Sequence, residues 1–278
     1  GIVRTTQDFG YQGDPPTHPE LLDWMAVEFV KQGWSVKKLH RLIVTSATYR
    51  QSSVITHEKQ AKDPENRLLS YSPRLRLEAE LIRDSALAES GLLSAKIGGP
   101  SVFPPQAPGI TTDGAYGPLK WTVSTGEDRY RRGLYTFSKR TAPYATFATF
   151  DAPSGEATCA RRDISNTPLQ ALTLLNSEAF LEAAQALGKS LAARPGTVAE
   201  KTTILFRRCL TRPPTASESK ALTAYYETQH ARFRNKELDP TKIAGTGSEA
   251  DTENLSERAA WTALARVLLN VDEAIVRR

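Results

Sequence analysis

Seven basic side chains gather in one short part of the chain and give it the chemistry of an anion-binding segment. Residues 129–162 contain these seven and two acidic residues, a net charge of +5, while the other 244 residues balance at 29 basic and 29 acidic. Guanidinium groups ahead of a helix start favour a carboxylate, sulfate or phosphate ligand. The alternative is that these arginines pair with acidic residues of a neighbouring helix. The predicted ligand-binding residues are Arg131, Lys139, Arg140, Arg161, Arg162 and Asn166.

Candidate catalytic residues are scattered, and their spacing selects no reaction. They are His18, His40, Asp151 and Cys159. Cys159 lies just before two arginines, whose positive charge favours a reactive thiolate, and the alternative is an unreactive loop thiol. The chain has no Gly-x-Ser-x-Gly, Walker-type, Gly-x-Gly-x-x-Gly or His-Glu-x-x-His motif, so no hydrolase or nucleotide-binding class is indicated.

The histidine and cysteine contents argue against a metal or haem site in this segment. The four histidines have no metal-ligand spacing, and no Cys-x-x-Cys-His motif for c-type haem occurs. With two cysteines and no apolar run near twenty residues, the chain is neither a disulfide scaffold nor a membrane span. It begins without Met or a leader, so we expect a piece of a longer protein whose targeting signal lies upstream.

Three helices are predicted before the basic segment, and they are expected to help position it. Thr17 and Glu20 predict a capping box before a helix that ends near Gly33, and Ser35 is expected to cap a second helix. The apolar spacing in both helices predicts a buried stripe on each. A third helix is expected over residues 75–93, with its charged residues on a solvated, salt-bridged face.

The helical patterns stop in the middle of the chain. Residues 98–128 contain six Gly and five Pro, which no continuous helix or central strand could hold, so a long loop is predicted. The alternation over residues 133–151 predicts two short strands around a turn at 141–144. The basic side chains would therefore flank a small β element.

The last part of the chain is predicted to be helical again. Capping boxes open at Thr167, Thr197 and Thr215, and the stripe after the first box continues to Leu187. A polar excursion is expected over residues 235–254, before a closing helix that contains Trp261 and Leu264.

Together these patterns predict a mainly α fold, a helical bundle-like module with a small two-stranded β element and a long Pro/Gly-rich loop. The expected parts are an N-terminal helical part at 1–97, the loop with the β element and basic segment at 98–165, and a C-terminal helical part at 166–278. We expect them to form one compact unit cut from a larger protein.

Short motifs along nearly the whole chain carry a family resemblance. They include PTHPELLDW at 16–24, LHRLIVTSATYRQ at 39–51, RLEAE at 76–80, KRTAP at 139–143, FDAP at 150–153, NTPLQAL at 166–172 and ARVLLN at 265–270. The combination resembles the planctomycete-type C-terminal domain of unknown function that follows cytochrome-c-like domains in large exported proteins. The chain departs from that pattern at Ser138, where the family usually has Trp, which weakens the case for an aromatic platform there.

The resemblance implies an extracytoplasmic location, in a periplasm-like compartment or at the cell surface. It also implies upstream domains of the same polypeptide as partners, including a cytochrome-c-like domain that would carry the c-type haem. It supplies no catalytic residue. In that setting an acidic or sulfated polysaccharide is a possible anionic partner for the basic segment, and nucleic acid is not expected because the rest of the chain is balanced in charge.

Three functions follow from the sequence as hypotheses. The first is a module of uncharacterised activity that binds an anionic ligand through the basic segment. The second is a catalytic domain, an oxidoreductase or a hydrolase of carbohydrate, coupled to a tethered haem domain. The third is a structural module that packs against its upstream domain, which a large exposed apolar patch would favour.

Overall fold

The computed structural model describes residues 2–8, 10–107, 109–110, 120–245 and 254–277. The chain forms two compact units. Unit 1 comprises Gly1–Leu75, Cys159–Arg161 and Arg277–Arg278, and unit 2 comprises Arg76–Thr158 and Arg162–Val276. The boundaries expected at 97/98 and 165/166 follow composition, and neither coincides with the division between these units.

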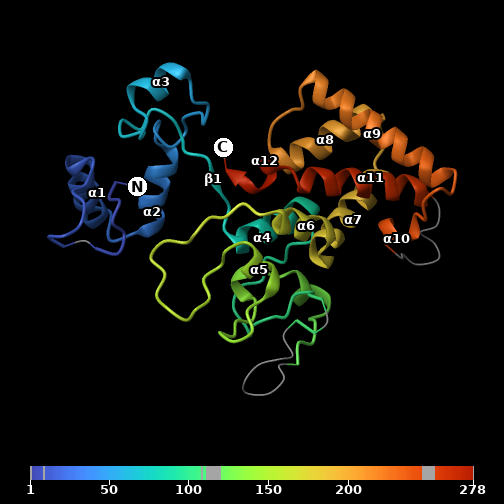
Figure 1. The fold of residues 1–278 in the computed structure, drawn as a ribbon, viewed down its shortest axis with the longest axis horizontal. Helices are drawn as coiled ribbons and strands as arrows, with labels where there is room; N and C mark the ends of the chain where they lie inside the picture. Colours follow the sequence, from blue (N-terminus) through green and yellow to red (C-terminus); the bar gives the residue numbers. More distant parts are fainter. Residues whose placement is uncertain (1, 9, 108, 111–119, 246–253, 278) are drawn as a thin grey trace. The chain divides into compact units, whose positions relative to one another are not determined.

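The fold is mainly α, which confirms the predicted class (Figure 1). Within the described ranges the strands are β1 (Leu75–Arg76) and β2 (Val276–Arg277), which pair in a two-stranded sheet. No helix in the described part of the chain is both long and apolar enough to cross a membrane.

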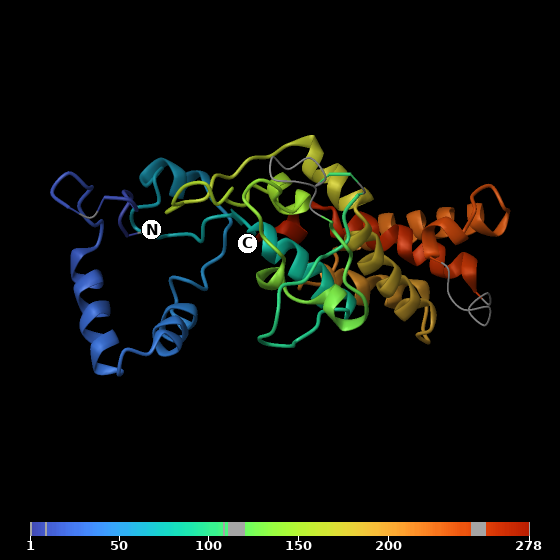
Figure 2. The ribbon, with the colours of Figure 1, turned by 90° about the horizontal axis from the view of Figure 1, so that it is seen from below.

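Unit 1 begins with two helices joined by a short turn. Helix α1 (Pro19–Lys31) ends just before Gly33, whose φ of 73° suits glycine (Figure 2, blue). The Ser35 hydroxyl caps helix α2 (Val36–Thr45) by accepting from the Lys38 N–H, as predicted. Helix α3 (His57–Lys62) follows.

Two predictions for unit 1 are wrong. The capping box at Thr17 does not form, because the N-cap is His18 and the Thr17 hydroxyl instead lies 2.9 Å from the His18 Nδ1 atom. The buried stripes are also absent, since neither α1 nor α2 contains a buried residue. Their apolar side chains are half-buried at most, which leaves an apolar surface described below.

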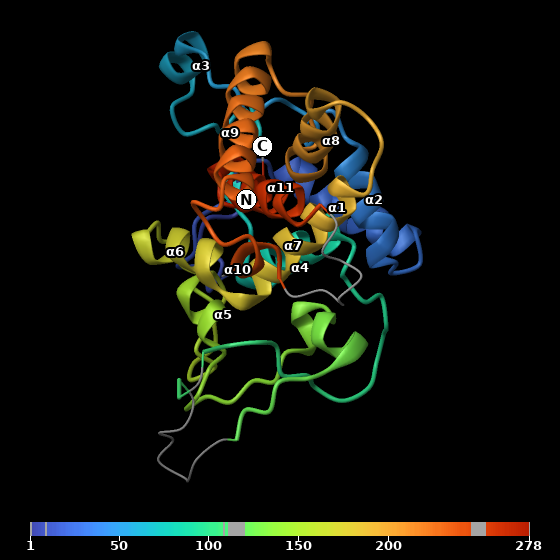
Figure 3. The same ribbon diagram turned by 90° about the vertical axis from the view of Figure 1, so that its right-hand side faces the viewer.

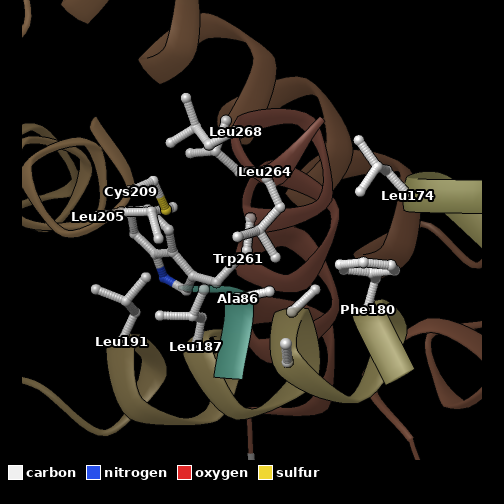
Figure 4. Close-up of a cluster of buried hydrophobic side chains, with 14 of the residues drawn as sticks. Ala86, Leu174, Phe180, Leu187, Leu191, Leu205, Cys209, Trp261, Leu264 and Leu268 are labelled. Carbon is white, nitrogen blue, oxygen red and sulfur yellow. The ribbon is translucent and has the colours of Figure 1, made fainter. Parts of the chain in front are cut away.

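Unit 2 holds the hydrophobic core. Helix α11 (Leu255–Leu269) packs against α7 (Glu178–Ala192) and α9 (Ala216–Arg234) (Figures 1 and 3). Fully buried Trp261 lies among leucines of α7 and of α8 (Val198–Leu210) (Figure 4). A side chain at Gly188 would place its Cβ 2.2 Å from the Thr262 Oγ1 atom, so glycine is what lets α7 and α11 approach.

Three of the predicted helix starts are confirmed. Capping boxes at Thr167, Thr197 and Thr215 open α6 (Pro168–Asn176), α8 and α9. The stripe predicted to continue from Thr167 to Leu187 is broken at Ser177, which ends α6 and begins α7. The sequence pattern runs on because both helices present apolar residues to the same core.

Helix α4 (Ala79–Ser90) is shorter than predicted. Leu75 and Arg76 belong to β1, so the helix begins at Ala79 rather than at 75. The predicted solvated charged face is wrong, because Arg83 and Asp84 are buried. Both side chains form hydrogen bonds to the backbone of residues 129–133.

The strands predicted within 133–151 are wrong. The chain there forms the 3₁₀ turn η2 (Gly133–Tyr135) and then helix α5 (Ala145–Thr149), and another 3₁₀ turn, η1 (Gly126–Tyr130), precedes them. Extended residues between these elements make isolated bridges, Ser94 to Arg131 and Val102 to Thr136. Residues of this segment therefore pair with the chain before it instead of with each other, and the two-stranded sheet is formed by β1 and β2.

The remaining helices are short. They are α10 (Thr241–Ala244) and α12 (Asp272–Ile275). The closing helix predicted around Trp261 is confirmed as α11. Residues 108 and 111–119 of the predicted loop, and residues 246–253 of the predicted polar excursion, lie outside the described ranges.

Candidate functional site

A pocket of about 510 Å³ lies in unit 2 beside the start of α4, and we call it the α4 pocket. Its walls come from α4, from residues 132–138, from α5 and the residues that flank it, and from Arg162. Its polar lining comprises three carboxylates, two guanidiniums and several hydroxyls. These groups belong to Glu78, Glu80, Asp84, Arg132, Arg162, Thr136, Ser138 and Ser154.

Glu80 and Arg162 form the charged pair on one wall. The Arg162 Nη1 and Nη2 atoms donate to the two Glu80 carboxylate oxygens at 2.6 and 3.2 Å, and Arg162 Nη1 lies 3.6 Å from Glu78. Burial tends to raise the pKa of Glu80, but the hydrogen bond from Arg162, a backbone hydrogen bond and the Arg162 charge together outweigh it, so the pKa is lowered. Glu80 is therefore ionised at neutral pH.

Asp84, one turn along α4 from Glu80, and its neighbour Arg83 hold the backbone of residues 129–133. The Gly133 N–H donates to Asp84 at 2.6 Å, while Arg83 donates to the carbonyls of Arg131 at 2.6 Å and Arg129 at 2.9 Å. A Cβ on Gly133 would lie 2.9 Å from the Glu80 Cβ, so η2 can press against α4 because this residue is glycine. Two adjacent helix residues thus hold the backbone of the basic segment.

Aromatic rings form another part of the pocket lining. Phe137, which lines the pocket, stacks on Phe103 with centroids 4.8 Å apart. Tyr144 and Phe147 meet edge to face at 4.9 Å, and Trp121 stacks on Tyr144 at 5.7 Å. The Trp121 and Tyr144 polar atoms donate to backbone carbonyls of the preceding loop, so the rings are fixed in place.

Much of the basic segment is committed to structural contacts. Arg129 donates to Glu178 at 2.6 Å and to Glu182 at 2.5 Å, and these hydrogen bonds raise the pKa of its guanidinium. Arg131 is completely buried, donates to the carbonyls of Lys96, Gly98 and Pro100, and stacks 3.7 Å over the Tyr135 ring.

The other predicted ligand-binding residues have different surroundings. Lys139 is half-buried and Arg140 is exposed, and no acidic side chain in the described ranges pairs with either. Asn166 is exposed in unit 2, whereas Arg161 is exposed in unit 1. Of the six predicted residues, the α4 pocket contains Arg162.

The four candidate catalytic residues make no hydrogen bond to one another in the described structure. Half-buried His18, exposed His40 and exposed Cys159 belong to unit 1. Asp151, in unit 2, accepts from Arg76 at 2.6 Å and from the Ser165 N–H at 2.8 Å. Burial tends to raise the pKa of Asp151, but these hydrogen bonds lower it, so this carboxylate is an ionised structural link. The described residues contain no group of three His, Cys, Asp or Glu side chains placed to hold a metal ion.

The carboxylates that line the α4 pocket are not among the predicted site residues. Glu80 and Asp84 are four residues apart, the spacing that places two side chains on one helix face, and this signal was available. The same spacing also fits a solvated face, because the chain that covers this one is 46 residues or more away, as in the hydrogen bond from Arg83 to the Arg129 carbonyl.

A second missed pair lies between α4 and α8. Burial raises the pKa of Glu89 to about 8, and it also raises the pKa of the Cys209 thiol that faces it. One Glu89 carboxyl oxygen is buried and has no hydrogen-bond partner among the described residues. A carboxyl group in this setting keeps its proton at neutral pH.

Unit 1 exposes an apolar row that we call the α1 stripe. Its members are Trp24, Val27 and Val30, which are 50%, 52% and 51% exposed. They follow at intervals of three residues, so they share one face of α1. Trp34, just beyond the helix, is 68% exposed, and its ring meets the Phe29 ring edge to face with centroids 5.4 Å apart. Met25 and Phe29 on the other side of the helix are half-buried, so α1 is apolar on two faces.

Comparison with known proteins identifies a family but no characterised relative. No curated protein and no solved structure matches the chain. Residues 1–226 match the family PSD1, described as a protein of unknown function (DUF1553). That match covers most of the chain, includes α1, the α4 pocket and α8, and ends within α9. The chain is therefore a member of the PSD1 family of proteins of unknown function (DUF1553).

Proposed function

We propose that this chain is a docking module of a larger extracytoplasmic polypeptide and that unit 1 packs against a neighbouring folded domain through the α1 stripe. The observation that carries the proposal is the exposure of Trp24, Val27 and Val30 on a helix that contains no buried residue. A helix that is apolar on two faces is expected to be covered on both.

Helix length supports this proposal. Helices of 13 and 10 residues, as α1 and α2 are, are marginal in water without tertiary packing. In the described structure the buried hydrophobic cluster consists of unit 2 residues, so unit 1 has no comparable core. Covering the α1 stripe would contribute about 1 kcal/mol or more for each large side chain, enough to hold both helices in place.

The partner follows from the family resemblance. In the related exported proteins a cytochrome-c-like domain precedes this type of module, and we propose such a domain as the one that covers the α1 stripe. The c-type haem would then belong to the partner, and the location outside the cytoplasm is part of the same proposal.

Lys139 and Arg140 support a second candidate function, binding of an anionic polysaccharide. They have no acidic partner in the described ranges, unlike Arg129 and Arg162. Two cations form a smaller electrostatic site than the seven counted in the sequence, so we expect weak and salt-sensitive binding. Replacing both with alanine should abolish retention of this chain on a sulfated polysaccharide at low salt, and unchanged retention would refute it.

Limited proteolysis of the longer polypeptide tests the docking proposal. We expect the double variant Val27→Glu with Val30→Glu to expose α1 to cleavage at least tenfold faster than in the unmodified polypeptide, because buried charges would open the interface. The matched control is Leu172→Glu, an exposed leucine of α6 in unit 2, which should leave α1 cleavage unchanged. Equal cleavage in all three proteins would show that the stripe is not covered.

A further inference from the structure

The α4 pocket is a separate feature with its own chemistry. It lies in unit 2 and shares no residue with the α1 stripe, so it has no part in the docking proposed above. Its volume of about 510 Å³ is in the range of small-molecule sites, which combine apolar walls with a few fixed polar groups.

The polar lining alternates between groups that only accept and groups that only donate hydrogen bonds. The ionised Glu80 accepts, the Arg162 guanidinium beside it donates, and Asp84 and Arg132 repeat this pairing one turn along α4 at 3.4 Å. An alcohol hydroxyl both donates and accepts, so a ligand with several hydroxyls can satisfy both kinds of group at once.

Charge indicates a neutral ligand. The lining has three carboxylates and two guanidiniums. The carboxylates of Glu78, Glu80 and Asp84 would repel an anion, and the guanidiniums of Arg132 and Arg162 would repel a cation. The carboxylates are also already partly satisfied, Glu80 by Arg162 and Asp84 by the Gly133 N–H. A neutral group adds no uncompensated charge to this arrangement.

The remaining lining suits a ring with an apolar face. Phe137 and Phe147 present fixed rings, and two exposed leucines, Leu81 and Leu134, lie at the pocket. The Thr136 hydroxyl oxygen, which belongs to a lining residue, is buried and has no hydrogen-bond partner in the described structure. Flat apolar faces edged by hydroxyls are the chemistry of a pyranose sugar.

From this geometry we propose that the α4 pocket binds a neutral oligosaccharide. The ring faces pack against Phe137 and Phe147, and the hydroxyls bond to Glu78, Glu80 and the two arginines. Glu78 is the carboxylate most available to a ligand, because its side chain is 56% exposed and its nearest guanidinium atom is 3.6 Å away.

The test is a glycan array with neutral hexose and N-acetylhexosamine oligosaccharides and their sulfated and uronate counterparts, followed by calorimetry with the strongest neutral binder. We expect binding to neutral oligosaccharides, about tenfold or more weaker in Glu78→Gln, the loss typical of a hydrogen bond to a charged group. Ala148→Trp should abolish binding, because exposed Ala148 of α5 lines the pocket.

Two matched controls separate the pocket from general surface effects. Glu227→Gln and Ala224→Trp make the same changes at exposed positions of α9, and both should bind like the unmodified chain. The proposal is overturned if no neutral oligosaccharide binds, if the bound glycans are all acidic, or if Ala148→Trp binds normally.

Discussion

Arg83 and Asp84 are consecutive residues of α4, yet they hold the same distant segment by opposite chemistry. The guanidinium donates to the carbonyls of Arg129 and Arg131, and the carboxylate accepts from Gly133. Each satisfies a backbone group that a segment without regular structure would otherwise leave unpaired. At the residue scale, then, arginines in this part of the molecule organise backbone more than they attract ligands.

Arg131 gives the clearest stability prediction of this kind. Arg131→Ala should lower the free energy of unfolding by about 2–4 kcal/mol, because three carbonyls lose a charged donor and the Tyr135 ring loses its stacked partner. Urea denaturation measures the change. Exposed Arg140→Ala is the control and should shift stability by less than about 0.5 kcal/mol, and equal effects would contradict the structural role of Arg131.

Glu89 predicts a dependence of stability on pH. Its pKa is raised by burial from 4.5 to about 8, so the folded chain retains a proton that the unfolded chain loses between these values. The free energy of unfolding should therefore be highest below pH 4.5 for this group and fall as the pH rises to 8, by up to about 1.4 kcal/mol per unit.

Comparison with Glu89→Gln isolates this contribution from all other titrating groups. The variant stays neutral, so the difference in stability between it and the unmodified chain should grow in favour of the variant from pH 5 to pH 9. Thermal or urea unfolding at both pH values measures it. A difference that does not change with pH would mean that Glu89 is ionised in the folded chain.

At the scale of elements, local signals were predicted well and long-range ones were not. The boxes at Thr167, Thr197 and Thr215 depend on residues within one helical turn, and all three form. The sequence at Thr17 also has Thr followed by Glu three residues later, but no capping box forms there. The N-cap is His18, and the Thr17 hydroxyl donates to the Ile2 carbonyl instead.

The middle of unit 2 could not be predicted for a related reason. The alternation around 134–138 is real, but the partner of Thr136 is Val102 in the preceding loop, and no local pattern identifies that pairing. The α4 pocket depends on the same long-range contacts. Its carboxylates could be placed on one helix face from spacing alone, whereas the covering residues Arg132 and Arg162 could not.

Gly133 tests how closely η2 must approach α4. Gly133→Ala should destabilise unit 2 by about 1–3 kcal/mol, because the new methyl group would lie 2.9 Å from the Glu80 Cβ and force the elements apart. The control is Ser154→Ala at an exposed position. Gly155→Ala is not a suitable control, because Gly155 has a positive φ and alanine would strain the backbone there even though there is space for a methyl group. Equal denaturation midpoints for Gly133→Ala and Ser154→Ala would contradict the close contact between Gly133 and α4.

At the scale of the whole molecule, the two units differ in kind. Unit 2 has a continuous core around Trp261 and carries the α4 pocket. Unit 1 has helices without buried residues and an exposed row of large apolar side chains. The apolar spacing predicted buried stripes on α1 and α2, but periodicity does not say what covers a stripe, and no residue of either helix is buried in this chain.

Amide hydrogen exchange of α1 is the measurement that tests the docking claim most directly. It should be recorded for this chain alone and for the longer polypeptide with its neighbouring domain, with α11 as the internal reference. We predict that α1 exchanges nearly unprotected in the chain alone and at least a hundredfold more slowly in the longer polypeptide, while α11 is protected in both. Protection of α1 equal to that of α11 in the chain alone, or no gain in the longer polypeptide, would contradict the account.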